Sequence, residues 1–130
     1  MISGFDHYSL AADRALLDQL RDFYVAVVGL QNGPRPPFQS FGYWLYAGGR
    51  DVLHLSEAQP NDPRQENARS TFDHAAFSCT DLDAAVARLL ARSIEYRTAE
   101  VPLSGQRQLF FRDPAGNGVE LTCPAPDSSD

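Results

Sequence analysis

Two stretches of the chain, FDHYSLAADRALLDQL (residues 5–20) and FDHAAFSCTDLDAAVARLL (residues 72–90), carry the same pattern. The triplet Phe-Asp-His opens both, at position 5 and again 67 residues later at position 72, and a short β-prone segment follows each triplet. Apolar residues then recur at three- and four-residue spacing, which predicts an amphipathic helix. The internal repeat therefore predicts that each half of the chain begins with a strand followed by a helix.

Both predicted helices have start signals. Asp13 can cap the first, Gly29 stands where a left-handed residue would end it, and Thr80 and Asp81 open the second in the manner of a capping box. The predicted buried residues are Leu16, Leu17, Leu20, Phe23, Tyr24, Val27 and Val28 in the first helix, and Leu82, Val86, Leu89 and Leu90 in the second.

Three further β segments are expected after each helix. In the first half they lie near Leu30, over 41–47 and over 51–56; in the second half they lie near Tyr96, over 106–112 and over 118–123. The glycine-rich stretch 47–50 and the segment Asp-Pro-Ala-Gly-Asn-Gly at 113–118 have the composition of turns.

The predicted fold class is therefore α+β, built from two βαβββ modules. We expect the first module over residues 1–56, a polar connector over 57–70, the second module over 71–123 and a polar tail over 124–130. One such module buries little surface by itself, so the pair is expected to share a core or a partner.

Composition narrows the possible partners. Apolar residues make up 43% of the chain, enough for a hydrophobic core, and the net charge of −6 disfavours nucleic acid and anionic membranes as partners. No apolar run is long enough to span a bilayer, and the first residues do not resemble a signal peptide, so a cytoplasmic protein is expected. Cys79 and Cys123 are expected to end strands as free buried thiols, with pairing or a redox role as the alternative.

The three histidines of the chain fall on repeat-related positions. His7 and His74 match each other in the first strands of the two modules, and His54 lies in the last strand of the first module. Glu120, between two apolar residues, stands within one position of the counterpart of His54. Strand alternation places these four side chains on polar faces, while their apolar neighbours are free to face the helices.

Imidazole and carboxylate groups that converge on one face suit a divalent transition metal such as Fe, Mn, Ni, Co or Zn. Burying Glu120 without a partner is costly, and a metal ion would supply that partner. The alternatives are that each histidine is an ordinary hydrogen-bonded side chain and that Glu120 pairs with Arg107 or Arg112.

Taken together, the doubled histidine strand, the segment Arg21–Tyr24 with Gly29, and the run over 111–121 resemble the vicinal oxygen chelate superfamily. This superfamily includes glyoxalase I, extradiol dioxygenases, fosfomycin-resistance enzymes and bleomycin-binding proteins. The resemblance implies a cupped, partly closed β barrel around a metal held by His7, His54, His74 and Glu120. It also implies a homodimer that completes the barrel, with His7 and His54 from one chain and His74 and Glu120 from the other.

The resemblance implies a metalloenzyme acting on a small molecule with vicinal oxygens, either isomerase- or lyase-like or dioxygenase-like, with Glu120 as a catalytic base. The alternative is a metal-free drug- or metabolite-binding protein of the bleomycin-resistance type. One position departs from the family pattern, since glyoxalase I-like members usually have glutamate, and epimerase-like members glutamine, where this chain has His54. This leaves open whether His54 binds the metal or lies behind the ligands.

An aromatic-rich strand beside a cationic loop suggests where a substrate binds. The expected substrate-binding residues are Arg35, Phe38, Tyr43, Trp44, Arg107 and Phe110. The alternative is that these aromatics belong to the core and that the arginines are ordinary surface residues.

Overall fold

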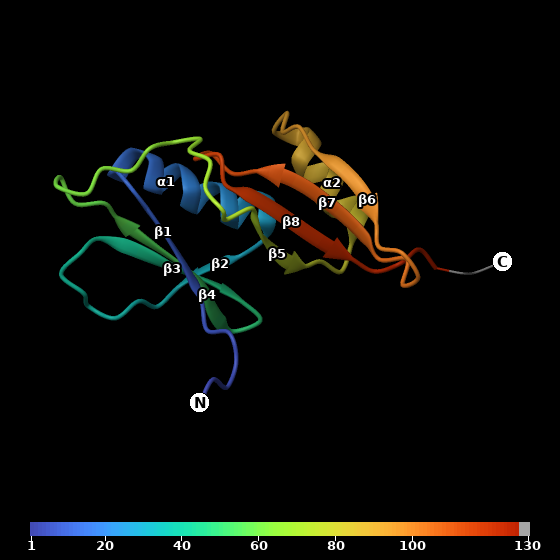
Figure 1. Ribbon diagram of the computed structural model, residues 1–130, viewed down its shortest axis with the longest axis horizontal. Coiled ribbons are helices and arrows are strands. Elements are labelled where there is room, and N and C mark those ends of the chain that lie inside the picture. The colour runs from blue at the N-terminus through green and yellow to red at the C-terminus, as the bar shows by residue number, and fades with distance from the viewer. Residues whose placement is uncertain (128–130) are drawn as a thin grey trace. The chain divides into compact units, whose positions relative to one another are not determined.

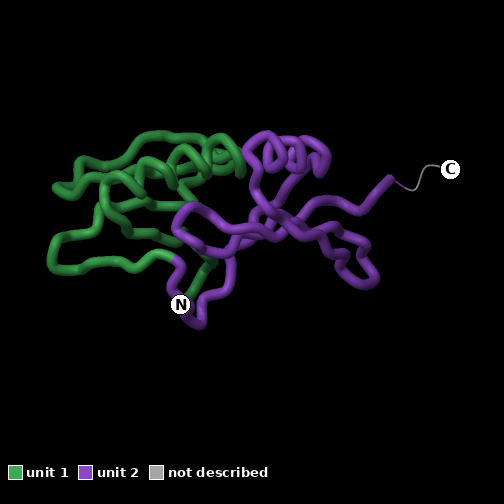
Figure 2. Tube along the Cα trace, turned by 90° about the horizontal axis from the view of Figure 1, so that it is seen from above, with its two compact units in different colours: residues 1–66 green, residues 67–130 purple. Residues whose placement is uncertain are grey.

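The computed structural model describes residues 1–127, so residues 128–130 of the predicted polar tail lie outside the described part of the chain. The chain divides into two compact units, Met1–Glu66 and Asn67–Asp130, which Figure 2 shows in different colours. Each unit has the order strand, helix, three strands (Figure 1), so the predicted α+β fold of two βαβββ modules is confirmed. No helix within residues 1–127 has the length and apolar character needed to cross a bilayer.

The first module consists of β1 (Tyr8–Ala12), α1 (Arg14–Phe23), the π-helix η1 (Tyr24–Val28), β2 (Gln31–Gly33), β3 (Gly42–Ala47) and β4 (Arg50–Glu57). As predicted, the Asp13 side chain caps α1 by accepting a hydrogen bond from the Leu16 amide at 2.9 Å. The expected single helix instead changes to π geometry at Tyr24, and Gly29 ends it in the left-handed conformation with φ of 98°.

The sheet of the first module has the strand order β1-β4-β3-β2, with β1 parallel to β4 and the other neighbours antiparallel. Leu53 and Leu55 on β4 are fully buried. Strand alternation places His54, between them, on the opposite face. His7 was expected within the first strand but lies one residue before β1, which starts at Tyr8.

The second module consists of β5 (His74–Ser78), α2 (Leu82–Ala91), β6 (Arg97–Glu100), β7 (Arg107–Arg112) and β8 (Gly118–Cys123), and its sheet has the equivalent order β5-β8-β7-β6. Asp81 caps α2 through the Ala84 amide at 3.0 Å. Ala85 and Leu89 are fully buried in α2, whereas Leu90 is 63% exposed. The prediction that Leu90 is buried was therefore wrong, because the narrow buried stripe of α2 follows positions 85 and 89 and leaves the adjacent position 90 outside it.

The last strand shows why Glu120 is an unusual residue. Val119, Leu121 and Cys123 alternate along β8 as buried apolar residues, and Glu120 is nevertheless only 6% exposed. The turn before β8 is held by Asp113, whose Oδ1 accepts hydrogen bonds from the amides of Ala115 and Asn117, both at 2.9 Å. A well-defined turn followed by a regular strand thus places a buried carboxylate on the polar face of the second sheet.

Candidate metal and substrate site

His74 and Glu120 form a close pair in the second module. His74 begins β5, where it lies opposite Gly118 in the parallel pairing with β8, and Glu120 lies two residues further along that strand. Positions 118 and 120 share one face of β8, so both side chains extend from the same face of the sheet. The Nε2 atom of His74 lies 3.0 Å from Oε1 of Glu120. The structure therefore brings together the two second-module residues that were predicted as metal ligands.

The two carboxylate oxygens of Glu120 have different surroundings. Oε2 accepts hydrogen bonds from Thr122 Oγ1 at 2.7 Å and from Gln108 Nε2 at 3.1 Å. Oε1 faces His74. Glu120 does not form the alternative ion pair with Arg107 or Arg112. Arg107 instead donates to the Pro124 carbonyl, and Arg112 donates to the Gly116 carbonyl. Glu120 is thus oriented with one oxygen held and the other directed at an imidazole.

Both ring nitrogens of His74 face carboxylate oxygens. Nδ1 lies 2.7 Å from Oδ2 of Asp73, while Nε2 faces Glu120. The hydrogen bond to His74 holds the pKa of Asp73 below its ordinary value. A neutral imidazole has one N–H, so with Nδ1–H donated to Asp73 its Nε2 lone pair would point at an oxygen. A proton or a metal ion between Nε2 and Oε1 removes that repulsion.

The first module repeats the aspartate–histidine arrangement. His7 Nδ1 lies 2.7 Å from Oδ1 of Asp6, just as His74 Nδ1 lies beside Asp73. A metal-binding histidine commonly donates a hydrogen bond from its other ring N–H group to a carboxylate, which sets the tautomer and orients the ring. The repeated Asp-His dipeptide therefore fits a ligand pair that binds through Nε2.

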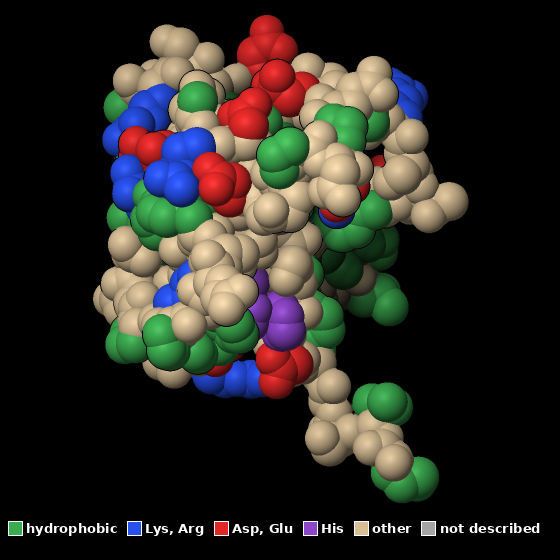
Figure 3. All heavy atoms as spheres, turned by 90° about the vertical axis from the view of Figure 1, so that its left-hand side faces the viewer, with side chains coloured by type: hydrophobic (Ala, Val, Ile, Leu, Met, Phe, Trp, Pro, Cys, Tyr) green, Lys and Arg blue, Asp and Glu red, His purple; other side chains and the backbone are tan. Residues whose placement is uncertain are grey.

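His54 is held differently from the other two histidines. Its ring stacks on His7, with centroids 3.6 Å apart, and on Trp44, with centroids 4.0 Å apart. Its Nε2 lies 2.7 Å from Oδ2 of Asp51, and this hydrogen bond holds the pKa of Asp51 below its ordinary value. In Figure 3, histidine side chains reach the surface next to acidic side chains. With Nε2 paired to Asp51, only Nδ1 of His54 remains for a metal in this arrangement.

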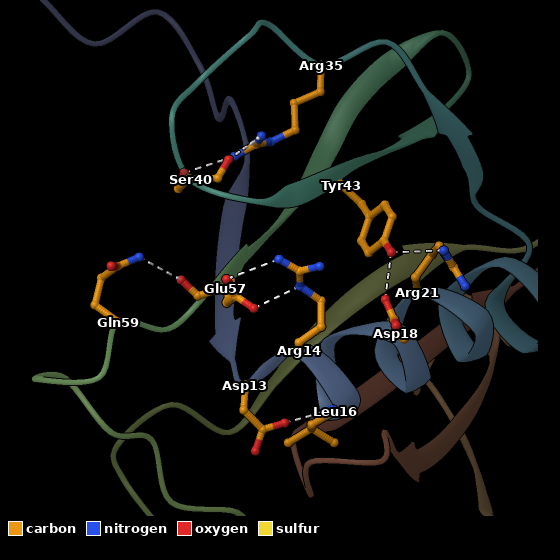
Figure 4. Close-up of polar contacts among 10 residues, drawn as sticks. All are labelled: Asp13, Arg14, Leu16, Asp18, Arg21, Arg35, Ser40, Tyr43, Glu57 and Gln59. Atoms are coloured by element: carbon orange, nitrogen blue, oxygen red, sulfur yellow. Dashed lines mark hydrogen bonds and ion pairs between the residues drawn. The ribbon is translucent and has the colours of Figure 1, made fainter.

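The Trp44 face of the first module carries two more of the predicted substrate-binding residues. The Phe38 ring lies 6.1 Å from the Trp44 ring, and the Arg35 guanidinium lies 4.9 Å from the centroid of Phe38. Two Arg35 nitrogens donate to Ser40 (Figure 4), while its Nε is buried with no hydrogen-bond partner among the described residues. This face combines flat aromatic surface with a cationic side chain.

Tyr43 lies on the other face of β3. It is opposite Leu55 in the sheet register, whereas Trp44 is opposite His54. Its hydroxyl donates to Asp18 at 2.6 Å and accepts from Arg21 at 3.0 Å, both from α1 (Figure 4). Burial, followed by the hydrogen bond to Asp18, raises the pKa of the Tyr43 phenol. The structure thus separates Tyr43 from the Trp44 face with which it was grouped.

A cavity of about 500 Å³ opens beside His74 in the second module. Phe110 lines it, with its ring edge-on to His74 at 5.9 Å and the Arg97 guanidinium 4.1 Å from its centroid. Arg112 also lines the cavity. Arg107, which was predicted to meet an anionic group, is at the opposite end of β7, because it pairs with Cys123 whereas Arg112 pairs with Gly118 beside His74.

Sequence reasoning overlooked several residues that the structure places at the site. They are Asp6, Asp73, Gln108, Thr122 and Arg97. The two aspartates had a signal, since each precedes a histidine in the repeated triplet. The other three are recognisable only once strands β6, β7 and β8 are in register.

The donor set suits a divalent transition metal, because it offers imidazole nitrogens and one oriented carboxylate oxygen. Across residues 1–127, no three histidine, cysteine, aspartate or glutamate side chains are grouped so that they could hold a metal ion. Of the four predicted ligands, the structure thus pairs His74 with Glu120 in the second module and His7 with His54 in the first.

The doubled βαβββ fold is that of the glyoxalase class of proteins. Residues 4–121 match the Glyoxalase/Bleomycin resistance protein/Dioxygenase superfamily, and the chain belongs to this family. It is similar to lactoylglutathione lyase from Agrobacterium tumefaciens (TM-score 0.64, 27% identity, 94% of each chain covered). It is also similar to TnmS3, an antibiotic-binding protein from Streptomyces sp. CB03234 (TM-score 0.66, 25% identity, 95% of this chain and 98% of that chain). A 49-residue segment is 45% identical to the uncharacterized protein YaeR of Escherichia coli K12 and covers 37% of this chain and 38% of that protein.

Proposed function

We propose that this protein is a divalent-metal-dependent enzyme that acts on a small molecule with vicinal oxygens, by isomerase- or lyase-like or by dioxygenase-like chemistry. The observation that carries the proposal is the His74–Glu120 pair, in which a buried carboxylate oxygen and an imidazole nitrogen lie 3.0 Å apart. Membership of the family and the similarity to a lactoylglutathione lyase support an enzyme of this kind.

In this proposal His7, His54, His74 and Glu120 are the metal ligands. His7 and His74 bind through Nε2, because Asp6 and Asp73 occupy their Nδ1 atoms. His54 would bind through Nδ1, because its Nε2 is paired with Asp51. When bound, the metal would polarise two neighbouring substrate oxygens and stabilise negative charge that develops on them.

Glu120 has a second role in the proposal, as the catalytic base. Thr122 and Gln108 hold its Oε2, so a substrate proton would be taken up at Oε1, the oxygen that faces His74. Low exposure of the side chain keeps bulk water away from this oxygen.

Each module offers an aromatic surface that we propose takes part in substrate binding. Trp44 and Phe38 would stack on a planar group and Arg35 would bind an anionic one, while Phe110 lines the cavity beside His74. Tyr43, which faces α1, and Arg107, at the far end of β7, are less well placed for this role.

Two further parts of the proposal concern assembly and location. We propose that the protein is a homodimer in which each metal site draws ligands from both chains, as expected from the family resemblance. We also propose that it is located in the cytoplasm. A dimeric mass in light scattering would support the first part, and a monomeric mass at micromolar concentration would contradict a shared site.

Metal analysis of the purified protein tests the main proposal. Apoprotein is incubated in turn with Fe(II), Mn(II), Ni(II), Co(II) and Zn(II), dialysed, and analysed for bound metal. Wild type should retain one of these metals, and His74→Ala and Glu120→Gln should lose it, because each removes one of the paired donors. Glu66→Ala, at an exposed position of the connector, is the control and should bind as wild type does. Negligible metal in wild type, or equal metal in all four proteins, would contradict the proposal.

The second candidate is a metal-free small-molecule-binding protein of the bleomycin-resistance type. It is favoured by the stack of Trp44, His54 and His7, which presents flat rings on one face, and by the similarity to an antibiotic-binding protein. Calorimetry with metal-free bleomycin in the presence of EDTA tests it. Binding that persists in the chelator and weakens in Trp44→Ala would favour this candidate over the enzyme.

A further inference from the structure

The two cysteines of the chain, Cys79 and Cys123, are neighbours in the second module. Cys79 directly follows β5 and Cys123 ends β8, and these two strands are parallel partners with Ser78 opposite Thr122. The Cys79 amide donates to the Thr122 carbonyl at 2.8 Å, so the pairing continues to the cysteines. Two cysteines 44 positions apart in the sequence are therefore placed side by side on neighbouring strands.

This arrangement suits a disulfide. Neighbouring strands lie about 4.7–4.9 Å apart, within the range of about 4.4–6.8 Å that disulfides span between Cα atoms. Both cysteines are free thiols in this structure, and each is the only possible intramolecular partner of the other, because the chain has two cysteines. A bond between them would need little backbone movement.

The two thiols differ in access to solvent. Cys79 is half-buried, whereas Cys123 is 1% exposed. Burial, followed by the hydrogen bond to Cys79, raises the pKa of the Cys123 thiol to about 12, so this thiol stays protonated at neutral pH. A small oxidant in solution would therefore meet Cys79 first.

We propose that Cys79 and Cys123 form a reversible intramolecular disulfide when a hydroperoxide oxidises the protein. The Cys79 sulfur attacks one peroxide oxygen as a thiolate and becomes a sulfenic acid, while the other oxygen takes a proton from solvent and leaves as water or an alcohol. Cys123 then loses its proton as its sulfur attacks the Cys79 sulfur, and that proton leaves with the sulfenic hydroxyl group as water. Two thiols are oxidised by two electrons while one O–O bond is reduced, and a dithiol reverses the change.

The consequence of the bond follows from the strands that it would join. β5 carries His74 and β8 carries Glu120, so the disulfide would link the two strands of the imidazole–carboxylate pair at their other end. It would also close a loop that contains α2, β6, β7 and β8. Closing such a loop restricts the unfolded chain, so the oxidised protein should unfold at a higher denaturant concentration than the reduced protein.

Thiol counting by mass spectrometry tests the proposal with the full chain. The protein is reduced, freed of reductant, treated with hydrogen peroxide, denatured and alkylated with N-ethylmaleimide. Oxidised wild type should be about 2 Da lighter than the reduced chain and take up no maleimide, and dithiothreitol should restore both alkylation sites. On a non-reducing gel it should remain a single chain.

Two single variants serve as controls. Cys123→Ala should lose the 2 Da shift and instead gain about 16 Da or more at Cys79, because no resolving thiol is present. Cys79→Ser should keep its buried thiol available for alkylation after denaturation. Circular dichroism of each variant checks that it is folded. The proposal is overturned if wild type keeps both alkylation sites under peroxide that fully oxidises glutathione, or if it forms only disulfide-linked dimers.

Discussion

Replacing Thr122 with valine should destabilise the second module by releasing one oxygen of Glu120. The Thr122 hydroxyl donates to Oε2 of Glu120 at 2.7 Å, and the carboxylate is only 6% exposed, so water cannot fully replace a lost donor. Hydrogen bonds to charged groups contribute about 1.5–3 kcal/mol to stability. Because Gln108 still donates to the same oxygen, the loss should lie in this range and not above it.

The expected result is a fall of about 1.5–3 kcal/mol in the free energy of unfolding, equivalent to about 10- to 150-fold in the unfolding equilibrium. Urea titration followed by far-UV circular dichroism is the appropriate assay, because Trp44, the single tryptophan, lies in the other module. Thr122→Ser keeps the hydroxyl and should cost much less than Thr122→Val. Valine matches threonine in shape, so packing changes little.

A double-mutant cycle with Glu120→Gln separates the hydrogen bond from other effects of the substitution. In that background the acceptor is neutral, and Thr122→Val should cost only about 0.5–1.5 kcal/mol. An unfolding free energy of Thr122→Val within about 0.5 kcal/mol of wild type, or an equal cost with and without the Glu120 carboxylate, would contradict a stabilising hydrogen bond to that group.

Three further predictions concern stability. Asp113→Ala should lower the unfolding free energy by about 2–3 kcal/mol in urea titration, since it removes the acceptor of two backbone amides in the turn before β8; an unchanged midpoint would contradict this. Tyr43→Phe should cost about 1 kcal/mol at neutral pH by removing the hydroxyl bonded to Asp18. Because the folded-state pKa of Tyr43 is raised, its contribution is complete below about pH 10 and is lost as pH rises through that higher value, so the variant should lose less stability in alkali than wild type. Gly116→Ala should cost more than about 1 kcal/mol, because Gly116 has φ of 92° and an added Cβ would lie 3.0 Å from the Asn67 Cα; equal thermal stability of variant and wild type would refute this.

Local signals in the sequence were sufficient to predict the helices and strands and their order. Asp13 caps the first helix as predicted, and the second begins within the predicted capping-box segment, with Asp81 as its cap, because a cap depends on residues three positions apart. The repeated Phe-Asp-His triplet correctly identified a doubled module. Leu90 was wrongly predicted as buried, because helical spacing identifies an apolar stripe but not the width of the surface that covers it.

The geometry of the site depends on the register of the strands as well as on the amino-acid sequence. The sequence singled out His7, His54, His74 and Glu120, and strand alternation placed His74 and Glu120 on one face. The 3.0 Å approach of these two residues, however, depends on the parallel register of β5 and β8. A shift of that register by one residue would turn Glu120 to the apolar face.

The sequence by itself determined the two βαβββ modules, their caps and turns, and the residue types available for metal chemistry, because these follow from short-range periodicity and local hydrogen bonding. Only the tertiary structure decided that Gln108 and Thr122 hold Glu120, that Trp44 and Tyr43 lie on opposite faces, and that Cys79 and Cys123 lie side by side. Each of these arrangements depends on how the strands pair and on which face of its strand a side chain lies. Such pairing is set by the packing of the whole module, which no local stretch of sequence specifies.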